Sequence, residues 1–168
     1  MESGLGMTPN DVDQLTIRVA TVDDAEIVAA HRANMFMDTG RLTNEGALAM
    51  REILRAQLPP MLASGEYIGW FLVTSEDTVV AGAGAQVRHL LPRPETLIGR
   101  EALVVNVYVD PEYRRLGLAR RLMLAILDWA PEQGIERIAL HPSVMGRHLY
   151  ETLGFTPSNE LILYQKQS

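Results

Sequence analysis

The stretch VDPEYRRLGLARRLM, residues 109–123, has the residue types to bind phosphate. It joins an apolar, β-branched run to an apolar stretch with helical spacing. A helix N-terminus leaves its first N–H groups unpaired and carries roughly half a positive charge, so it attracts phosphate oxygens. Gly117 permits close approach to the backbone, Ala119 keeps the next position small, and four arginines can pair with phosphate: Arg114, Arg115, Arg120 and Arg121. The pattern predicts a phosphate-binding turn for a nucleotide-bearing cofactor.

Two other phosphate-binding motifs are absent from the sequence. It contains no GxxxxGK[ST] and no GxGxxG, which argues against an NTPase P-loop and a dinucleotide fingerprint. The simpler alternative is a helix start with solvated arginines. The combination of strand, proline turn, Arg-x-x-Gly-x-Ala and helix favours the phosphate site.

Composition narrows the class of protein. A chain of 168 residues with 47% hydrophobic residues fits one soluble domain. The net charge of -6 argues against generic binding to nucleic acid or to an acidic membrane. The absence of cysteine excludes disulfides and thiolate metal sites and fits a cytoplasmic protein. Neither a signal peptide nor a membrane-length apolar run is visible, so we expect a loose tail at residues 1–14 and one domain at 15–168.

The apolar periodicity predicts an alternation of strands and helices. Strands are expected at 15–21, 67–75, 78–90, 102–110, 135–143 and 160–167, with a hairpin between the second and third. Helices are expected at 21–40, at 44–62 with a break at Pro59-Pro60, at 114–134 and at 143–155. The fold class is therefore α/β (α+β), with a mixed, mostly antiparallel sheet, one right-handed parallel crossover and helices on both faces.

Residues 107–123 resemble motif A of the GCN5-related N-acetyltransferase (GNAT) family, whose signature is [RQ]-x-x-G-x-[GA], and SVMGRHLYETLGF, residues 143–155, resembles motif B. The order of elements agrees from Leu15 to Gln165. The resemblance implies the acyl-CoA N-acyltransferase fold, with a splayed parallel strand pair, and acetyl-CoA as cosubstrate without a metal. It also implies cofactor contacts from the strand and from the turn that follows it: Val107, Tyr108, Val109, Arg114, Arg115, Leu116, Gly117, Leu118, Ala119 and Arg120.

The implied reaction is attack of a primary amine on the thioester in a ternary complex. Tyr150 matches the family tyrosine that protonates the departing thiolate, and its ordinary pKa of ~10 keeps it protonated. Ser143 stands where many relatives have a cofactor-binding Asn. The glutamate that some relatives carry before motif B is absent, so Glu101, His141 or a water relay is left as the general base. Asn106, polar among valines, either orients substrate or makes a buried hydrogen bond.

The expected acceptor is a small-molecule amine or a peptide. A non-catalytic acyl-CoA-binding regulatory module is the alternative, and the intact Tyr150 argues against it. A nucleic-acid-binding helix on the arginine cluster is a third reading, which the absence of interleaved aromatic residues disfavours. The histidines show no metal-ligand spacing. The apolar LILYQ segment, residues 161–165, has the character of an edge strand, and a homodimer through it is one arrangement that the sequence allows.

Overall fold

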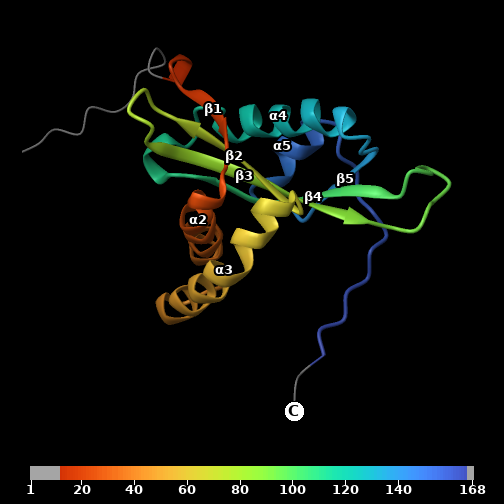
Figure 1. Ribbon diagram of the computed structural model, residues 1–168, viewed down its shortest axis with the longest axis horizontal. Coiled ribbons are helices and arrows are strands. Elements are labelled where there is room, and N and C mark those ends of the chain that lie inside the picture. The colour runs from red at the N-terminus through yellow and green to blue at the C-terminus, as the bar shows by residue number, and fades with distance from the viewer. Residues whose placement is uncertain (1–11, 166–168) are drawn as a thin grey trace, which may run out of the picture.

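Five strands form one mixed sheet in the order β1-β2-β3-β4-β5 in the computed structural model, which describes residues 12–165 (Figure 1). The first four strands pair antiparallel with their neighbours, and β5 pairs parallel with β4. This arrangement confirms the predicted fold class. The strands are β1 (Thr16–Val19), β2 (Tyr67–Val73), β3 (Val79–His89), β4 (Arg100–Val109) and β5 (Arg137–Leu140).

Helices cover both faces of the sheet. One face carries α2 (Ala25–Asp38) and α3 (Asn44–Ser64), which follow the 3-10 turn η1 (Val22–Asp24). The other face carries α4 (Leu118–Glu132), which follows the turn η2 (Pro111–Tyr113). The short helix α5 (Arg147–Thr152) packs its inner side chains against the same cluster as α4.

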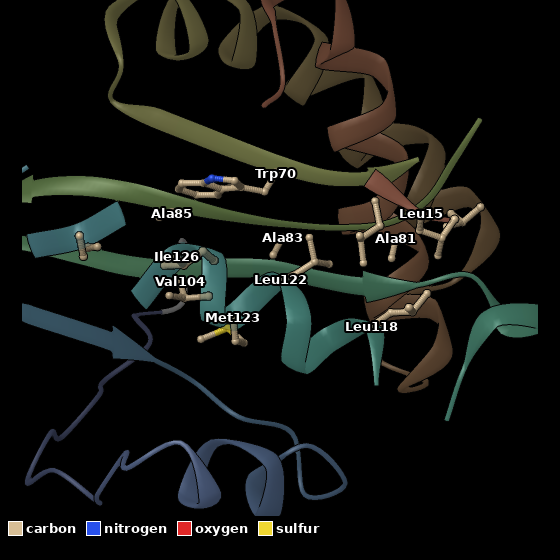
Figure 2. Close-up of a cluster of buried hydrophobic side chains, with 14 of the residues drawn as sticks. Leu15, Trp70, Ala81, Ala83, Ala85, Val104, Leu118, Leu122, Met123 and Ile126 are labelled. Carbon is tan, nitrogen blue, oxygen red and sulfur yellow. The ribbon is translucent and has the colours of Figure 1, made fainter. Parts of the chain in front are cut away.

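Small residues on β3 let α4 approach the sheet closely. Every second residue in this part of β3 is an alanine that faces α4 and is at most 3% exposed: Ala81, Ala83 and Ala85. Figure 2 shows them facing the apolar stripe of α4, which consists of Leu118, Leu122, Met123 and Ile126. Burying each of these four side chains contributes roughly 1.5–3 kcal/mol, so the packing fixes the start of α4 against the end of β4.

The predicted break of α3 at Pro59-Pro60 is wrong. The helix continues to Ser64 and ends at Gly65, whose φ of +77° is the left-handed conformation of a helix C-terminus. Each interior proline costs about 3 kcal/mol or more. Leu58, which is 3% exposed, and Met61 and Leu62 pack into the cluster beneath α2, and this burial offsets the cost.

The predicted last strand is also wrong over the described residues 160–165. This segment pairs with no strand, and Leu161, Leu163 and Tyr164 are each more than 80% exposed. Figure 1 shows it running past the end of β5 and away from the sheet. An apolar alternation predicts an extended chain, but it does not say which strand the chain will meet.

Most of the predicted tail, residues 1–11, lies outside the described residues. Its end is attached to the domain, because the side chain of Arg121 donates to the backbone oxygens of Val12 and Leu15. Val12 also packs against the core beneath α4.

Candidate active site

The parallel pair β4 and β5 separates halfway along β4. Glu101 to Val104 pair with Arg137 to Leu140, and there the ladder ends. β4 continues to Val109 with β3 as its only strand neighbour among the described residues. About 16 Å of strand edge is therefore open inside the sheet. An extended ligand with amide groups can hydrogen-bond to such an edge as an added strand does.

A bulge in β4 marks the start of this open edge. Val105 faces Gly84 and Tyr108 faces Gly82, so β4 has one residue more than β3 over this step. The extra residue is absorbed at Asn106, whose φ is +59°. The bulge places Asn106 on the same face as Val105, toward α2.

Asn106 makes two side-chain hydrogen bonds in this position. Its Nδ2 donates to the Tyr67 hydroxyl at 3.0 Å, and its Oδ1 accepts from the Arg32 guanidinium at 2.8 Å. Asn106 is 5% exposed, so both bonds satisfy groups that have left water. The burial of Tyr67 raises the pKa of its phenol to about 12, which keeps it a neutral donor and acceptor. Of the two roles predicted for Asn106, the structure has the buried hydrogen bonds.

The turn between β4 and α4 presents a row of backbone N–H groups. Arg115 and Gly117 have φ of +64° and +76°, and the first hydrogen bond of α4 runs from Arg121 N–H to Gly117 oxygen at 3.1 Å. The helix therefore leaves the N–H groups of its first three residues, 118–120, without an internal partner. Left-handed turns next to a helix N-terminus form anion-binding concavities.

The four predicted phosphate-binding arginines fall into two groups. Arg114 pairs with Asp38 at 2.5 Å and donates to the Val109 oxygen at 3.0 Å, so it ties the turn to the end of α2. Arg121 is held by the N-terminal segment. Arg115 and Arg120 are exposed and take part in no ion pair within residues 12–165, so they are available to an anion at the turn.

Tyr150 lies on α5 and contributes to a groove of about 660 Å³ beside β5, together with Leu140 and His141. Its ring meets Phe155 edge to face at 6.0 Å and packs on the core. Burial raises the pKa of its hydroxyl, which keeps the group protonated at neutral pH. The structure therefore brings Tyr150 and His141 to one groove, which runs along β5 from Glu136 to His141.

Ser143 and His141 belong to the turn that leads into α5. Ser143 Oγ accepts from the Gly146 N–H at 3.1 Å, and its carbonyl accepts from the Arg147 N–H at 3.1 Å. The Ser143 hydroxyl donates to no group within residues 12–165, so its hydrogen can be donated to a ligand. His141 Nε2 lies 3.0 Å from a carboxylate oxygen of Glu160 and is exposed.

Glu101 lies at the other end of β4 from the bulge. It faces Arg88 on β3 and Arg137 on β5 in register, is fully buried and pairs with both guanidinium groups. Asn106 lies five positions further along the strand, about 16 Å away. The structure does not bring Glu101 together with Tyr150 and His141. Its two ion pairs instead link β4 to its neighbours β3 and β5.

Sequence reasoning missed the polar residues that α2 and β2 contribute. His31 is 6% exposed, with its ring 4.9 Å from that of Tyr108. Arg32 and Tyr67 meet at Asn106. The available signal was AGAGA, residues 81–85, because a Cβ on Gly82 would lie 2.7 Å from His31 Nδ1 and one on Gly84 would lie 2.0 Å from the Tyr67 hydroxyl. Alternating glycines in a strand indicate that side chains cross directly over its backbone.

No three His, Asp or Glu side chains within residues 12–165 are placed to hold a metal ion. No helix in this part of the chain is long and apolar enough to cross a membrane.

Comparison with known proteins agrees with this geometry. A sequence model of the acetyltransferase (GNAT) family matches residues 42–155. Mycothiol acetyltransferase from Thermobispora bispora is 30% identical over 146 residues, which are 85% of this chain and 46% of that protein, so the chain spans about half the length of this relative.

Two crystal structures share the fold. A GCN5-related N-acetyltransferase from Ralstonia eutropha JMP134 has a TM-score of 0.83 and 32% identity, covering 90% of this chain and 98% of that one. A predicted acetyltransferase from Clostridium acetobutylicum, solved with acetyl-CoA, has a TM-score of 0.81 and covers 90% of this chain and 96% of that one. At 22% identity it shows the fold alone. The chain belongs to the GNAT family and is an acetyl-CoA-dependent N-acetyltransferase.

Proposed function

We propose that the chain transfers the acetyl group of acetyl-CoA to a primary amine of a small molecule or peptide in a ternary complex. The observation that carries this proposal is the continuity between the open edge of β4 and the N-terminus of α4. An extended cofactor arm bonded to Val107, Tyr108 and Val109 leads directly to the turn at Gly117. The backbone N–H groups of residues 115–120, with Arg115 and Arg120, would hold the diphosphate.

The thioester would then lie at the β4 bulge. Asn106 and Val107 have no partner residue on β3, so a backbone N–H there can donate to the oxyanion that forms when the amine attacks. A C–N bond forms and the C–S bond breaks. The Tyr150 hydroxyl gives its proton to the departing thiolate, and the amine gives up a proton to a base.

We propose His141 or a relay of water as the route for that proton. His141 lines the same groove as Tyr150, and its Nε2 can accept once the contact with Glu160 opens. We propose a structural role for Glu101, because two guanidinium groups hold it at the far end of β4.

Release of CoA thiol tests the function. Purified protein with acetyl-CoA and a panel of amines, amino acids and amino sugars should release thiol only when an amine is present, and the acetylated amine should appear by mass. Tight binding of acetyl-CoA without release by any amine would favour the non-catalytic acyl-CoA-binding module instead.

We propose the cytoplasm as the compartment of the protein, because a chain without cysteine needs no disulfides and fits a reducing environment.

We also propose that the chain forms a homodimer through residues 161–165. In this segment Leu161 is 98% exposed and Leu163 83%, and β5 presents an unpaired edge within the described sheet. Each copy therefore offers both an apolar extended segment and an open strand edge. A second copy satisfies both reciprocally across a two-fold axis.

Light scattering tests the dimer. The unchanged chain should show twice its mass of 18.7 kDa. The double variant Leu161→Asp/Leu163→Asp should be monomeric, because residues two positions apart share one face of an extended segment, and two charges on that face oppose its burial. A monomeric unchanged chain would mean that the segment folds onto its own β5 or stays unpaired, and a variant that remains dimeric would mean that another surface holds the dimer; either result overturns the proposal.

A further inference from the structure

Two arginines lie against the ring of Phe36 at the end of α2. The guanidinium carbon of Arg32 is 5.1 Å from the ring centre, and that of Arg41 is 5.0 Å away. The Arg41 N–H bonds to the Phe36 oxygen at 2.9 Å, which fixes the turn that carries Arg41. The result is a concentration of positive charge in a chain whose net charge is -6.

Arg32 is a partly buried cation without a carboxylate partner among residues 12–165. No Asp or Glu oxygen of these residues lies in ion-pair range of its guanidinium, and the only side-chain hydrogen bond that it makes with them goes to the neutral amide of Asn106. Arg18, Arg51 and Arg137 show how this chain treats comparable arginines. Their side chains are about one third exposed, and each pairs with Asp24, Glu26 or Glu101.

The partial burial of Arg32 changes the pKa of its side chain. It lowers the pKa of the guanidinium, whereas the carboxylate partners of Arg18 raise the pKa of that side chain. An arginine remains protonated at neutral pH in either case. Arg32 therefore has N–H donors and a charge that nothing within the described chain neutralises.

The position of Arg32 connects it with the reaction. Its partner Asn106 is the bulge residue of β4, next to Val107, where the thioester would lie. Arg32 approaches this point from α2, on the face of the sheet opposite α4. An acceptor that enters from the α2 side would pass Arg32 before its amine reaches the thioester.

We propose that Arg32, supported by Arg41, binds an anionic group of the acceptor. This inference rests on the proposed function and makes it more specific: the substrate is an amine that also carries a carboxylate or a phosphate. The planar fork of arginine suits either group, since both accept two parallel N–H···O bonds. A purely cationic polyamine would be repelled at the same place.

Matched acceptors test the inference. Each amino acid of a panel is compared with its carboxamide, and glucosamine 6-phosphate with glucosamine, by kcat/KM for CoA thiol release. The wild type should prefer the anionic member of the carboxylate pair or of the phosphate pair, and the pair that responds identifies the group. Arg32→Gln should lower kcat/KM for that member about ten- to a hundredfold, mainly through KM, and leave unchanged the partner whose corresponding group is neutral and which lacks the carboxylate or phosphate.

Arg93→Gln is the control, because it removes the same charge from the exposed loop that follows β3. It should change neither member of a pair. An Arg32→Gln variant that slows both members equally would show a structural role, and a wild type that prefers neutral members would show the absence of an anion site; each overturns the inference.

Binding separates this inference from the proposed function. If no amine releases thiol, the proposed function fails, and the anion site is then judged by thermal unfolding with N-acetylglycine or glucosamine 6-phosphate, each against its neutral counterpart. The site would be supported if an anionic compound raised the unfolding temperature of the wild type but not that of Arg32→Gln. It would be contradicted if the compound raised the unfolding temperature of both proteins equally, or of neither.

Discussion

Gly117 allows the phosphate site to be perturbed with little direct effect on packing. Its φ is +76°, and a Cβ built on it would meet no atom within 4 Å. A substitution there costs about 1–2 kcal/mol of backbone strain and causes no clash. Gly134 lies just beyond the other end of α4, with a φ of +67° and equally open surroundings. Gly134→Glu is therefore a control with matched strain and charge.

Gly117→Glu adds a carboxylate where the diphosphate is proposed to bind. A like charge about 4 Å away costs ~1 kcal/mol in water and ~4 kcal/mol at an effective dielectric constant of 20. Because the turn is exposed, the lower part of this range applies to each phosphate charge. We expect acetyl-CoA to bind about five- to thirtyfold more weakly.

Isothermal titration of each variant with acetyl-CoA measures this effect, and thermal unfolding checks that the two variants lose similar stability. Gly134→Glu should bind as the wild type does. Unchanged affinity in Gly117→Glu, or equal weakening in both variants, would refute the reasoning that the α4 turn holds the diphosphate.

Three further substitutions test other residues. Tyr150→Phe should bind acetyl-CoA normally but turn over about a hundredfold more slowly or worse, because it lacks the acid for the thiolate; normal turnover would remove Tyr150 from the mechanism. Glu101→Gln should lower the free energy of unfolding by about 3 kcal/mol, since it leaves Arg88 and Arg137 without their carboxylate, and turnover per folded molecule should be retained; lost turnover in a stable protein would make Glu101 the base. Burial lowers the pKa of His31 to about 4. Between about pH 6.5 and pH 4 the histidine takes up a proton in the unfolded chain but not in the folded one. The free energy of unfolding should therefore fall by roughly 3 kcal/mol as the pH drops through this range. His31→Gln should abolish this dependence in denaturant titrations, and an unaltered pH profile would contradict the assignment.

The parts of the fold that sequence predicted are those encoded locally. The β2–β3 hairpin follows from two apolar runs separated by Glu76 and Asp77, and it forms as expected. The turn before α4 follows from Pro111, which fixes its own φ, and from Gly117, which can adopt the left-handed conformation that the turn requires. Such signals depend on a few neighbouring residues, and tertiary contacts elsewhere in the chain do not change them.

The parts that sequence did not predict depend on residues far apart in the chain. Arg32 and Asn106 are 74 positions apart, and Asn106 and Tyr67 are 39 apart, yet they meet in one buried network. The role of Glu101 depends in the same way on the register that brings Arg88 and Arg137 to either side of it. These contacts follow from sheet register and from one bulge, which no local pattern specifies.

The crystal structure of the chain with acetyl-CoA tests the central claim most directly. We predict that the diphosphate will lie on the backbone N–H groups of residues 115–120, that the pantetheine arm will bond to Val107 and Val109, and that the sulfur will come within hydrogen-bonding reach of the Tyr150 hydroxyl. A cofactor bound elsewhere, with the open edge of β4 empty, would contradict the account.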